Sequence, residues 1–319
     1  ECATRNTARK VRLCTYSQSV LHETVAATGV AYDGRRGGLL YFYRDPKAFE
    51  AAVARSRVLS DNGCDVTALD RDGVVAADPA LAPVRERIAG AIYGRADESG
   101  DCRKFARGLA AWLQDKGVSF KFGSSVTGFE TRAGRIEAVV TDQGPVSADG
   151  YVLCLGVYSP HVARQLGAKL PIYPVKGYSV TLPAPEGNAP EVSITDEARK
   201  IVISRLGGRL RAAGQAEVGG YDLTLEPARA NSVLDALTSL LPQVAPRAGQ
   251  AEFWCGLRPM TPDGSPVIGR LEPLSNLFIN SGHGTLGWTL GAGSATLLAD
   301  LICGGLPQLD VSPFSITRF

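Results

Sequence analysis

The chain has 319 residues, of which 45% are hydrophobic and 21% are charged, and its formal net charge is +2. These proportions are typical of a globular protein with room for two domains and a sizeable core. A charge this small argues against nucleic acid as a main partner, because binding a polyanion needs a concentrated basic face. No run of 18 apolar residues occurs, so we expect no transmembrane segment.

The seven cysteines are scattered, and no two of them are spaced as C-x-x-C. We therefore expect neither a disulfide framework nor a metal site, since only three histidines are available as further ligands. Cysteines scattered in this way favour a reducing compartment. The expected location is therefore the cytoplasm. A peripheral contact on the inner face of the bacterial cell membrane is left open. The chain begins at Glu1 with no signal-peptide pattern, so we expect it to be a piece of a longer product.

The first part of the chain alternates helices and strands. Apolar residues at helical spacing predict a helix over the first ~30 residues, which ends near Gly29. A strand is predicted over residues 39–43. Asp45 then suits the N-cap of a second helix, with Pro46 in its first turn. Residues 64–95 favour short segments and loops.

From residue 100 the pattern changes. Asp101 is expected to cap an amphipathic helix that ends at Gly117. The strands predicted after it span residues 118–122, 126–131, 135–141 and 151–155. The last of these is a continuous apolar run that ends in Gly156. Such an order indicates a fragment of an open α/β sheet, which binds ligands at its strand ends.

Residues 171–255 have a different rhythm. Apolar residues alternate with polar ones around Tyr178, as in a half-buried strand. Residues 201–205 and 209–213 flank Gly207 and Gly208 and predict a hairpin. An amphipathic helix is predicted at residues 233–241. We interpret this region as an antiparallel sheet with a covering helix, inserted into the first domain.

A glycine-rich turn near residue 282 is the most informative motif. An apolar run, residues 277–281, ends in Gly282, and a helical pattern follows. A strand–turn–helix unit of this kind aims several backbone N–H groups and a helix dipole at one point, so it suits an anion or an electron-rich heterocycle. The alternative is a plain turn whose glycines serve packing.

Four segments together carry a resemblance to a known family. They are Gly100-Asp-Cys-Arg-Lys-Phe105, Tyr173-Pro-Val-Lys-Gly-Tyr-Ser179, Gly256-Leu-Arg-Pro-Met-Thr-Pro-Asp-Gly-Ser-Pro-Val-Ile-Gly269 and Gly282-His-Gly-Thr-Leu-Gly-Trp-Thr289. The chain resembles the flavin-dependent D-amino acid dehydrogenases, within the D-amino acid and glycine oxidase superfamily. The resemblance implies FAD as cofactor and oxidative deamination of D-amino acids to 2-oxo acids and ammonia. A hydride would pass from Cα to flavin N5, and the electrons would pass to a quinone or respiratory acceptor.

The expected fold class is α/β, or α+β over the whole chain. It combines an incomplete Rossmann-like FAD/NAD(P)-binding domain with an antiparallel-sheet substrate domain. The substrate domain is expected over residues 1–95, with the leading helix, and 161–255. The FAD-binding domain is expected over residues 96–160 and 256–319.

The resemblance also implies roles for single residues. Arg258 would hold the substrate carboxylate by two parallel hydrogen bonds. Tyr178 and Lys176 lie two apart on a predicted strand and so face one side. Tyr178 would cap the carboxylate or line the pocket, and Lys176 would pair with an acidic group or lie near the flavin. For all three, an ordinary structural role is the alternative.

The cofactor-binding residues implied by the resemblance lie mostly in the glycine-rich turn. They are Val126, Cys154, Gly156, Gly256, Gly282, His283, Gly284, Thr285, Leu286, Gly287, Trp288 and Thr289. Val126 would meet the adenine, and Cys154 and Gly156 would allow close approach of the dinucleotide. Core packing is the alternative for these three.

One departure from the family pattern is large. The family begins with a strand–Gly-x-Gly-x-x-Gly–helix unit that holds the ADP pyrophosphate, and nothing before residue 100 of this sequence fits such a unit. Either a separate N-terminal FAD-binding polypeptide supplies it, or it was removed or left out, or the product cannot hold FAD. The alternatives to a dehydrogenase are therefore an oxidase for glycine, sarcosine or D-proline-like substrates and a non-catalytic fragment or subunit.

Overall fold

A computed structural model describes residues 2–319, and this part of the chain folds as two compact units. Unit 1 contains the chain up to Gly29 together with Leu109–Val175 and Arg258–Phe319. Unit 2 contains Val30–Gly108 and Lys176–Leu257. The leading helix therefore belongs to unit 1, whereas the predicted domains grouped it with the substrate domain. The limits predicted for the substrate domain and the FAD-binding domain stay a prediction.

The sheet of unit 1 has three strands. They are β7 (Tyr151–Leu153), β13 (Val267–Arg270) and β14 (Leu277–Ser281). The central strand, β14, runs parallel to β7 and antiparallel to β13. A parallel pair joined by long connections is typical of an α/β sheet, as the pattern predicted.

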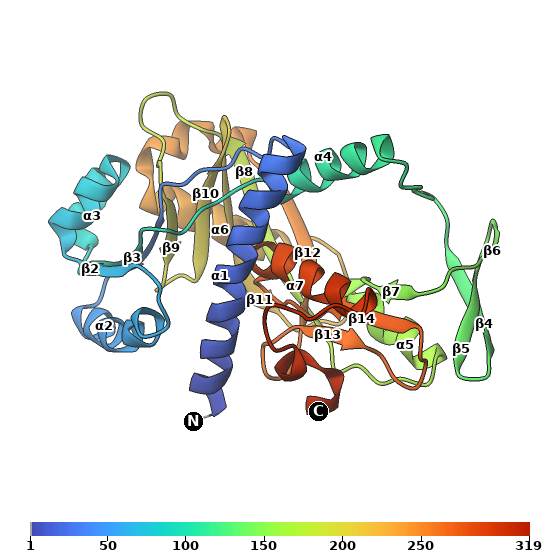
Figure 1. Cartoon of the computed structure of the whole chain (residues 1–319). Helices are drawn as coiled ribbons and strands as arrows, with labels where there is room; N and C mark the ends of the chain where they lie inside the picture. Colours follow the sequence, from blue (N-terminus) through green and yellow to red (C-terminus); the bar gives the residue numbers. More distant parts are fainter. Residues whose placement is uncertain (1) are drawn as a thin grey trace. The chain divides into compact units, whose positions relative to one another are not determined.

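Two helices of unit 1 pack along each other although they lie far apart in sequence. The helices α1 (Cys2–Thr28) and α7 (Gly287–Ile302) lie side by side in Figure 1, drawn in dark blue and red. Leu13 of α1 and Leu290 of α7 are fully buried in one apolar cluster. The backbone N–H of Gly293 also donates to Ser17 Oγ over 3.0 Å. The predicted N-terminal helix is thus confirmed.

A separate antiparallel meander follows in unit 1. It consists of β4 (Val126–Arg132), β5 (Arg135–Thr141) and β6 (Gly144–Val146). The side-chain amide of Asn276 bonds both the N–H and the carbonyl of Ile136, each over 2.9 Å, and so ties the meander to the strand that begins beside it. A short helix, α5 (Ser159–Gln165), comes after β7.

The predicted strand at residues 118–122 is wrong. Helix α4 (Cys102–Asp115) forms as expected, with Asp101 Oδ1 accepting from the N–H groups of Arg103 and Lys104. After it the chain is irregular, and the rings of Phe120 and Phe122 stack on each other at 5.4 Å. No strand of the described residues pairs with this segment, so its backbone groups lack the neighbour that a sheet requires.

The sheet of unit 2 has eight strands in the order β12-β8-β11-β10-β9-β1-β3-β2. Their bounds are β1 Leu39–Tyr43, β2 Val66–Leu69, β3 Gly90–Gly94, β8 Tyr173–Pro183, β9 Ser193–Asp196, β10 Ile201–Leu206, β11 Arg209–Glu217 and β12 Glu252–Met260. The β10–β11 hairpin is the one that the sequence predicts. The pair β1–β9 is parallel, whereas the pairs β1–β3, β9–β10 and β8–β11 are antiparallel.

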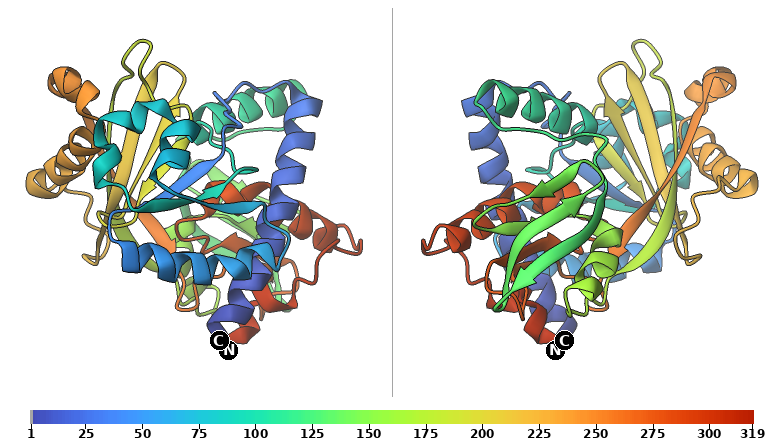
Figure 2. Two further views of the ribbon diagram at one scale, coloured as in Figure 1. Left: turned by 90° about the vertical axis from the view of Figure 1, so that its left-hand side faces the viewer. Right: turned by 90° about the vertical axis from the view of Figure 1, so that its right-hand side faces the viewer.

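One face of this sheet is covered by α6 (Pro227–Leu240), as Figure 2 shows. Val180 and Leu210 of the sheet and Val233 of the helix are fully buried in one core cluster. Helices α2 (Pro46–Ser60) and α3 (Arg71–Ala77) both contact β2 and β3, the last two strands in the sheet order. Asp45 caps α2 by accepting from the Ala48 N–H over 2.7 Å, as predicted. The mixed α/β class and the sheet with its covering helix are confirmed.

Candidate functional site

The glycine-rich turn lies in unit 1 between β14 and α7. Gly282 and Gly284 both adopt positive φ angles, 78° and 57°. The N–H of Gly284 donates to the carbonyl of Pro259 over 3.0 Å, which places the turn against the end of β12. Helix α7 begins at Gly287, and among the described side chains none caps its N-terminus. An uncapped helix start keeps its N–H groups and its positive dipole end available for an anionic group.

The two glycines are also required by packing. A Cβ atom at Gly282 would lie 2.8 Å from Thr261 Cγ2, and one at Gly284 would lie 2.9 Å from Met260 Sδ. The packing role that the sequence left open is therefore present. This packing role is compatible with a cofactor role, because tight packing around the two glycines fixes the position of the uncapped helix start.

The ends of the two parallel strands meet beside this turn. Ser281 Oγ, at the end of β14, donates to the carbonyl of Gly156, just after β7, over 3.1 Å. Ser159 Oγ donates to Ser281 Oγ over the same distance. The structure thus brings Gly156 and the Gly282–Gly284 turn together at the carboxyl edge of the sheet. In open α/β sheets this edge is where ligands bind.

Arg258 lies in unit 1, directly before Pro259, whose carbonyl accepts from the turn. Burial lowers the pKa of its guanidinium, which nevertheless stays protonated because free arginine titrates far above neutral pH. A desolvated cation next to the turn can bind a carboxylate strongly.

His283 is neutral at physiological pH. Burial lowers the pKa of its imidazole to about 4, and Nε2 lies 3.0 Å from Ser294 Oγ on α7. A group with so low a pKa is a weak general base at pH 7. Its low pKa therefore argues against proton transfer by His283 at neutral pH.

Two predicted cofactor residues are exposed. Val126 begins β4, in the meander and not in the three-stranded sheet. Cys154 follows β7, and desolvation by the surrounding protein raises the pKa of its thiol although the residue keeps an exposed surface. A raised thiol pKa gives no support to a reactive cysteine.

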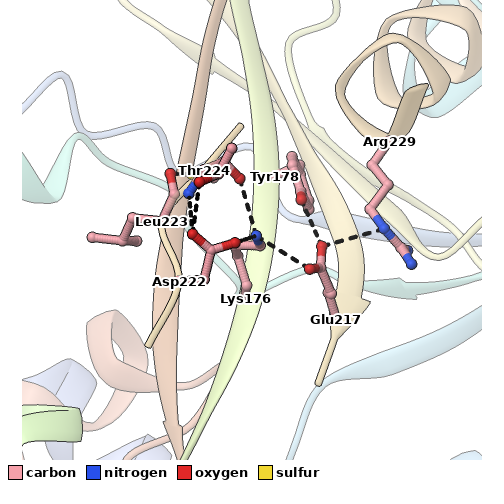
Figure 3. Close-up of polar contacts among 8 residues, drawn as sticks. Lys176, Tyr178, Glu217, Asp222, Leu223, Thr224 and Arg229 are labelled. Carbon is pink, nitrogen blue, oxygen red and sulfur yellow. Dashed lines mark hydrogen bonds and ion pairs between the residues drawn. The ribbon is translucent and has the colours of Figure 1, made fainter. Parts of the chain in front are cut away.

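Lys176 and Tyr178 lie in unit 2, in a network of charged side chains drawn in Figure 3. Only 2% of Lys176 is exposed, and its Nζ lies 3.1 Å from Glu217 Oε1 and 3.3 Å from Asp222 Oδ2. Nζ also donates to the carbonyl of Thr224 over 3.0 Å. The pairing of Lys176 with an acidic group, one of its two predicted roles, is therefore present.

The hydroxyl of Tyr178 donates to Glu217 Oε2 over 2.6 Å, and Arg229 Nε lies 3.2 Å from the same oxygen. Lys176 and Tyr178 thus share one carboxylate, as expected for residues on one side of a strand. Sequence reasoning missed Glu217, Asp222 and Arg229. The one available signal was the expectation that Lys176 pairs with an acidic group, because an ammonium inside a protein requires acidic partners.

The network shifts the titration of its members. Burial by itself would lower the pKa of Lys176, but hydrogen bonds to Glu217, Tyr178 and Asp222 outweigh it and raise that pKa. The hydroxyl of Tyr178, with further help from Lys176, lowers the pKa of Glu217. Hydrogen bonds from Thr224, with further help from Lys176, lower the pKa of Asp222 to about 2. All three groups are charged at neutral pH.

The described residues contain no group of three or more His, Cys, Asp or Glu side chains arranged to hold a metal ion. Within the same residues no helix is both long and apolar enough to cross a membrane.

A family model described as FAD dependent oxidoreductase, or DAO, matches residues 2–301. The chain belongs to this family. A D-amino acid dehydrogenase of Rhizobium johnstonii is 44% identical over 98% of this chain and 75% of its own length. One of Cereibacter sphaeroides is 44% identical over 99% of this chain and 72% of its own length. These relatives confirm the resemblance.

Solved structures of other amino-acid oxidising enzymes share the fold. Glycine oxidase from Geobacillus kaustophilus superposes with a TM-score of 0.85, at 24% identity, over 97% of this chain and 82% of its own. L-proline dehydrogenase from P. horikoshii gives a TM-score of 0.85 at 19% identity, with the same two coverages. At these identities the likeness concerns the fold alone.

The DAO fold requires a place for FAD, and the residues of unit 1 fit part of one. The uncapped start of α7 and the carboxyl edge of the β7–β14 pair suit the electron-rich flavin ring. The spacing Gly-x-Gly-x-x-Gly, which suits a pyrophosphate where it joins a strand to a helix, occurs once in the chain, at Gly282, Gly284 and Gly287 of this turn, and nothing before residue 100 has it.

Proposed function

We propose that this chain acts in the FAD-dependent oxidative deamination of D-amino acids to 2-oxo acids and ammonia. The observation that supports it most is 44% identity with D-amino acid dehydrogenases over nearly the full chain. The uncapped turn before α7 and the desolvated guanidinium beside it agree with that activity.

In this proposal Arg258 binds the α-carboxylate of the substrate by two parallel N–H bonds and so orients its Cα–H. The N–H groups at the start of α7, Gly287 to Thr289, stabilise negative charge on the cofactor. FAD, when bound, would accept the hydride, which carries both electrons. The neutral imidazole of His283 holds its place through Ser294 and adds no charge to the site.

Several predicted contacts belong to the proposal as well. Gly156 and Cys154 would lie along the dinucleotide, and Val126 would meet the adenine. Gly256 would allow close approach of the cofactor. Tyr178 would line the substrate site, whereas Lys176 has a structural task in the charged network that by itself accounts for its burial.

The proposed electron acceptor is a quinone or another respiratory carrier, in the cytoplasm or at the inner face of the membrane. A separate N-terminal polypeptide that carries the Gly-x-Gly-x-x-Gly unit is the proposed partner for the ADP end of FAD. Intact-mass analysis of the natively purified protein tests this partner, since it would co-purify as a second species.

Absorbance spectroscopy tests the function. The purified chain, incubated with FAD and then desalted, is expected to keep flavin absorbance and to lose it under anaerobic conditions when D-alanine, but not L-alanine, is added. A protein that stays colourless contradicts FAD binding by this chain alone. Equal bleaching by both enantiomers contradicts the D-amino acid assignment. Rapid reoxidation by air would indicate an oxidase instead of a dehydrogenase.

A further inference from the structure

Two side chains on separate strands of unit 2 stack on each other. The guanidinium carbon of Arg211, on β11, lies 5.3 Å from the centroid of the Trp254 ring, on β12. Strand β8 lies between these two strands in the sheet. Adjacent strands are ~4.8 Å apart, so the two side chains meet above β8 by reaching across it.

The stack lies on the sheet face that α6 does not cover. On β8 and β11, Val180 and Leu210 point into the core beneath α6. Because side chains alternate along a strand, Arg211 and its cross-strand partner Thr181 point to the other face, as does Ser179. Ser179 is only 2% exposed, and its hydroxyl has no hydrogen-bond partner in the described chain.

Among the described residues, Cys102 and Asp101 act on Arg211 only through space, and neither forms an ion pair with it. Within residues 2–319 it makes no ion pair, and its one side-chain hydrogen bond runs over 3.5 Å to Thr181 Oγ1. Asp101 acts on it through space, but Asp101 Oδ2 pairs with Arg209 over 2.9 Å and Oδ1 caps α4. Burial lowers the pKa of Arg211. A partly desolvated guanidinium with no acidic partner is costly unless an anion completes it.

Trp254 is 57% exposed, an unusual position for so large an aromatic side chain. Its indole lies over Gly256, where the ring would collide with any Cβ atom. The glycine therefore lets the indole lie flat along β12, next to Arg211. An exposed, fixed aromatic ring that orients a guanidinium is typical of binding sites for planar anions.

We propose that Arg211, Trp254 and Ser179 form a subsite that binds a carboxylate of the amino-acid substrate. The proposal rests on the proposed function for the kind of substrate. The guanidinium donates two N–H bonds to the carboxylate, Ser179 donates its hydroxyl, and Trp254 keeps the guanidinium plane in place. The carboxylate is the side-chain carboxylate of an acidic D-amino acid.

Calorimetric titration of the purified chain tests this subsite without any need for turnover. D-alanine and D-glutamate are titrated into the wild type and into Arg211→Met, which keeps the aliphatic stem and removes the charge. Arg209→Met is the matched control, because it removes a guanidinium of the same strand that already has its own partner, Asp101. Arg211→Lys is the second variant, because it keeps the positive charge but cannot donate two parallel N–H bonds. Melting temperatures of all variants establish that they are folded.

We expect Arg211→Met to weaken binding of D-glutamate by about tenfold to a hundredfold, the usual effect of losing hydrogen bonds to a charged group. Arg211→Lys should fall in between, and Arg209→Met should bind as the wild type does. A loss for D-glutamate alone supports the side-chain carboxylate, whereas a loss for both amino acids contradicts it. Equal affinity in the wild type and Arg211→Met, or no binding of either amino acid to the wild type, overturns the subsite.

Tryptophan fluorescence provides an independent readout. Binding at Arg211 should change the emission of the wild type, which has three tryptophans, and Trp254→Phe should abolish that change. A change that survives in Trp254→Phe contradicts the proposed place of binding. Failure of the FAD test with retained amino-acid binding would contradict FAD binding by this chain alone and leave the subsite intact.

Discussion

Lys176 Nζ lies 3.1 Å from Glu217 Oε1, on a lysine that is almost fully shielded from water. The second oxygen of the same carboxylate accepts from Tyr178 and pairs with Arg229. One carboxylate therefore joins β8, β11 and α6. Removing this carboxylate takes one partner from each of the two buried members, Lys176 and Tyr178, which is why its substitution should be felt strongly.

Glu217→Gln should lower the melting temperature clearly at pH 7. The amide keeps the shape of the side chain but removes the charge that balances Lys176, whose raised pKa should fall as a result. Differential scanning calorimetry measures the first effect. Glu186→Gln, at an exposed position of the same unit, is the control and should melt as the wild type does. Equal melting temperatures for the two variants would show that the network adds nothing to stability.

Tyr178→Phe distinguishes a structural task from a substrate task. If the hydroxyl acts only through Glu217, then the losses of stability in Tyr178→Phe and Glu217→Gln should overlap, and the double variant should be less destabilised than their sum. The hydroxyl donates to a carboxylate, so the single loss should be about 1.5–3 kcal/mol. Urea unfolding of the four proteins measures the cycle. Additive losses would contradict direct coupling between the two side chains.

Acid should weaken unit 2 through Asp222. Its pKa is about 2 in the folded chain, against 3.8 for an ordinary aspartate, so the folded state binds the proton less readily than the unfolded state. The stability it adds is complete above pH 4 and is lost as the pH falls towards 2. We expect urea unfolding at several pH values to show that the free energy of unfolding declines less over this range in Asp222→Asn than in the wild type. The same slope in both proteins would exclude the carboxylate as its cause.

His283 should make unit 1 more stable as the pH rises from 4 to 6.5. Its imidazole has a pKa of about 4 when folded and 6.5 in the reference state, so the unfolded chain binds more protons over this range. Two and a half pKa units correspond to about 3–4 kcal/mol at most. Chemical unfolding at several pH values should show that the free energy of unfolding rises more steeply with pH in the wild type than in His283→Gln, whose side chain does not titrate. NMR titration of the ring gives the folded pKa directly, and a value near 6.5 would contradict the prediction.

Gly282→Ala should destabilise unit 1 by about 1–3 kcal/mol, because the backbone has a positive φ and the new methyl group would press on Thr261. Gly291→Ala is the matched control, since Gly291 lies inside α7 and a Cβ there meets nothing within 4 Å. Alanine in a helix interior should be neutral or stabilising by up to about 1 kcal/mol. Thermal unfolding measures both. Unchanged stability of Gly282→Ala would show that the turn can accommodate the added methyl group.

Much of the fold could be predicted because the signals are local. Asp45 before Pro46, and Asp101 before an amphipathic stretch, identify helix starts by capping chemistry alone. Two glycines between two apolar runs identify the β10–β11 hairpin. The strand expected at residues 118–122 failed for the opposite reason, since a strand forms only where another strand completes its hydrogen bonds, and no sequence pattern states what lies beside it.

The candidate site was predictable only in part. The turn from Gly282 to Thr289 and the position of Arg258 follow from a motif of consecutive residues. Arg211 and Trp254 come from strands that are not neighbours in the sheet, and 42 residues separate them in sequence. The partners of Lys176 come from a strand, a loop and a helix. No local pattern encodes such convergence, so these groups become visible only after the sheet has been assembled.

The contact between Ser17 and Gly293 has a consequence for how the chain is made. Its two sides are separated by most of the polypeptide, and ribosomes add about 5–20 residues per second, so the buried side of α1 waits tens of seconds for α7. Every strand of the eight-stranded sheet has been synthesised before α7 begins. During translation one unit can therefore fold early, while the other remains open to chaperones and proteases until residues 287–302 have emerged.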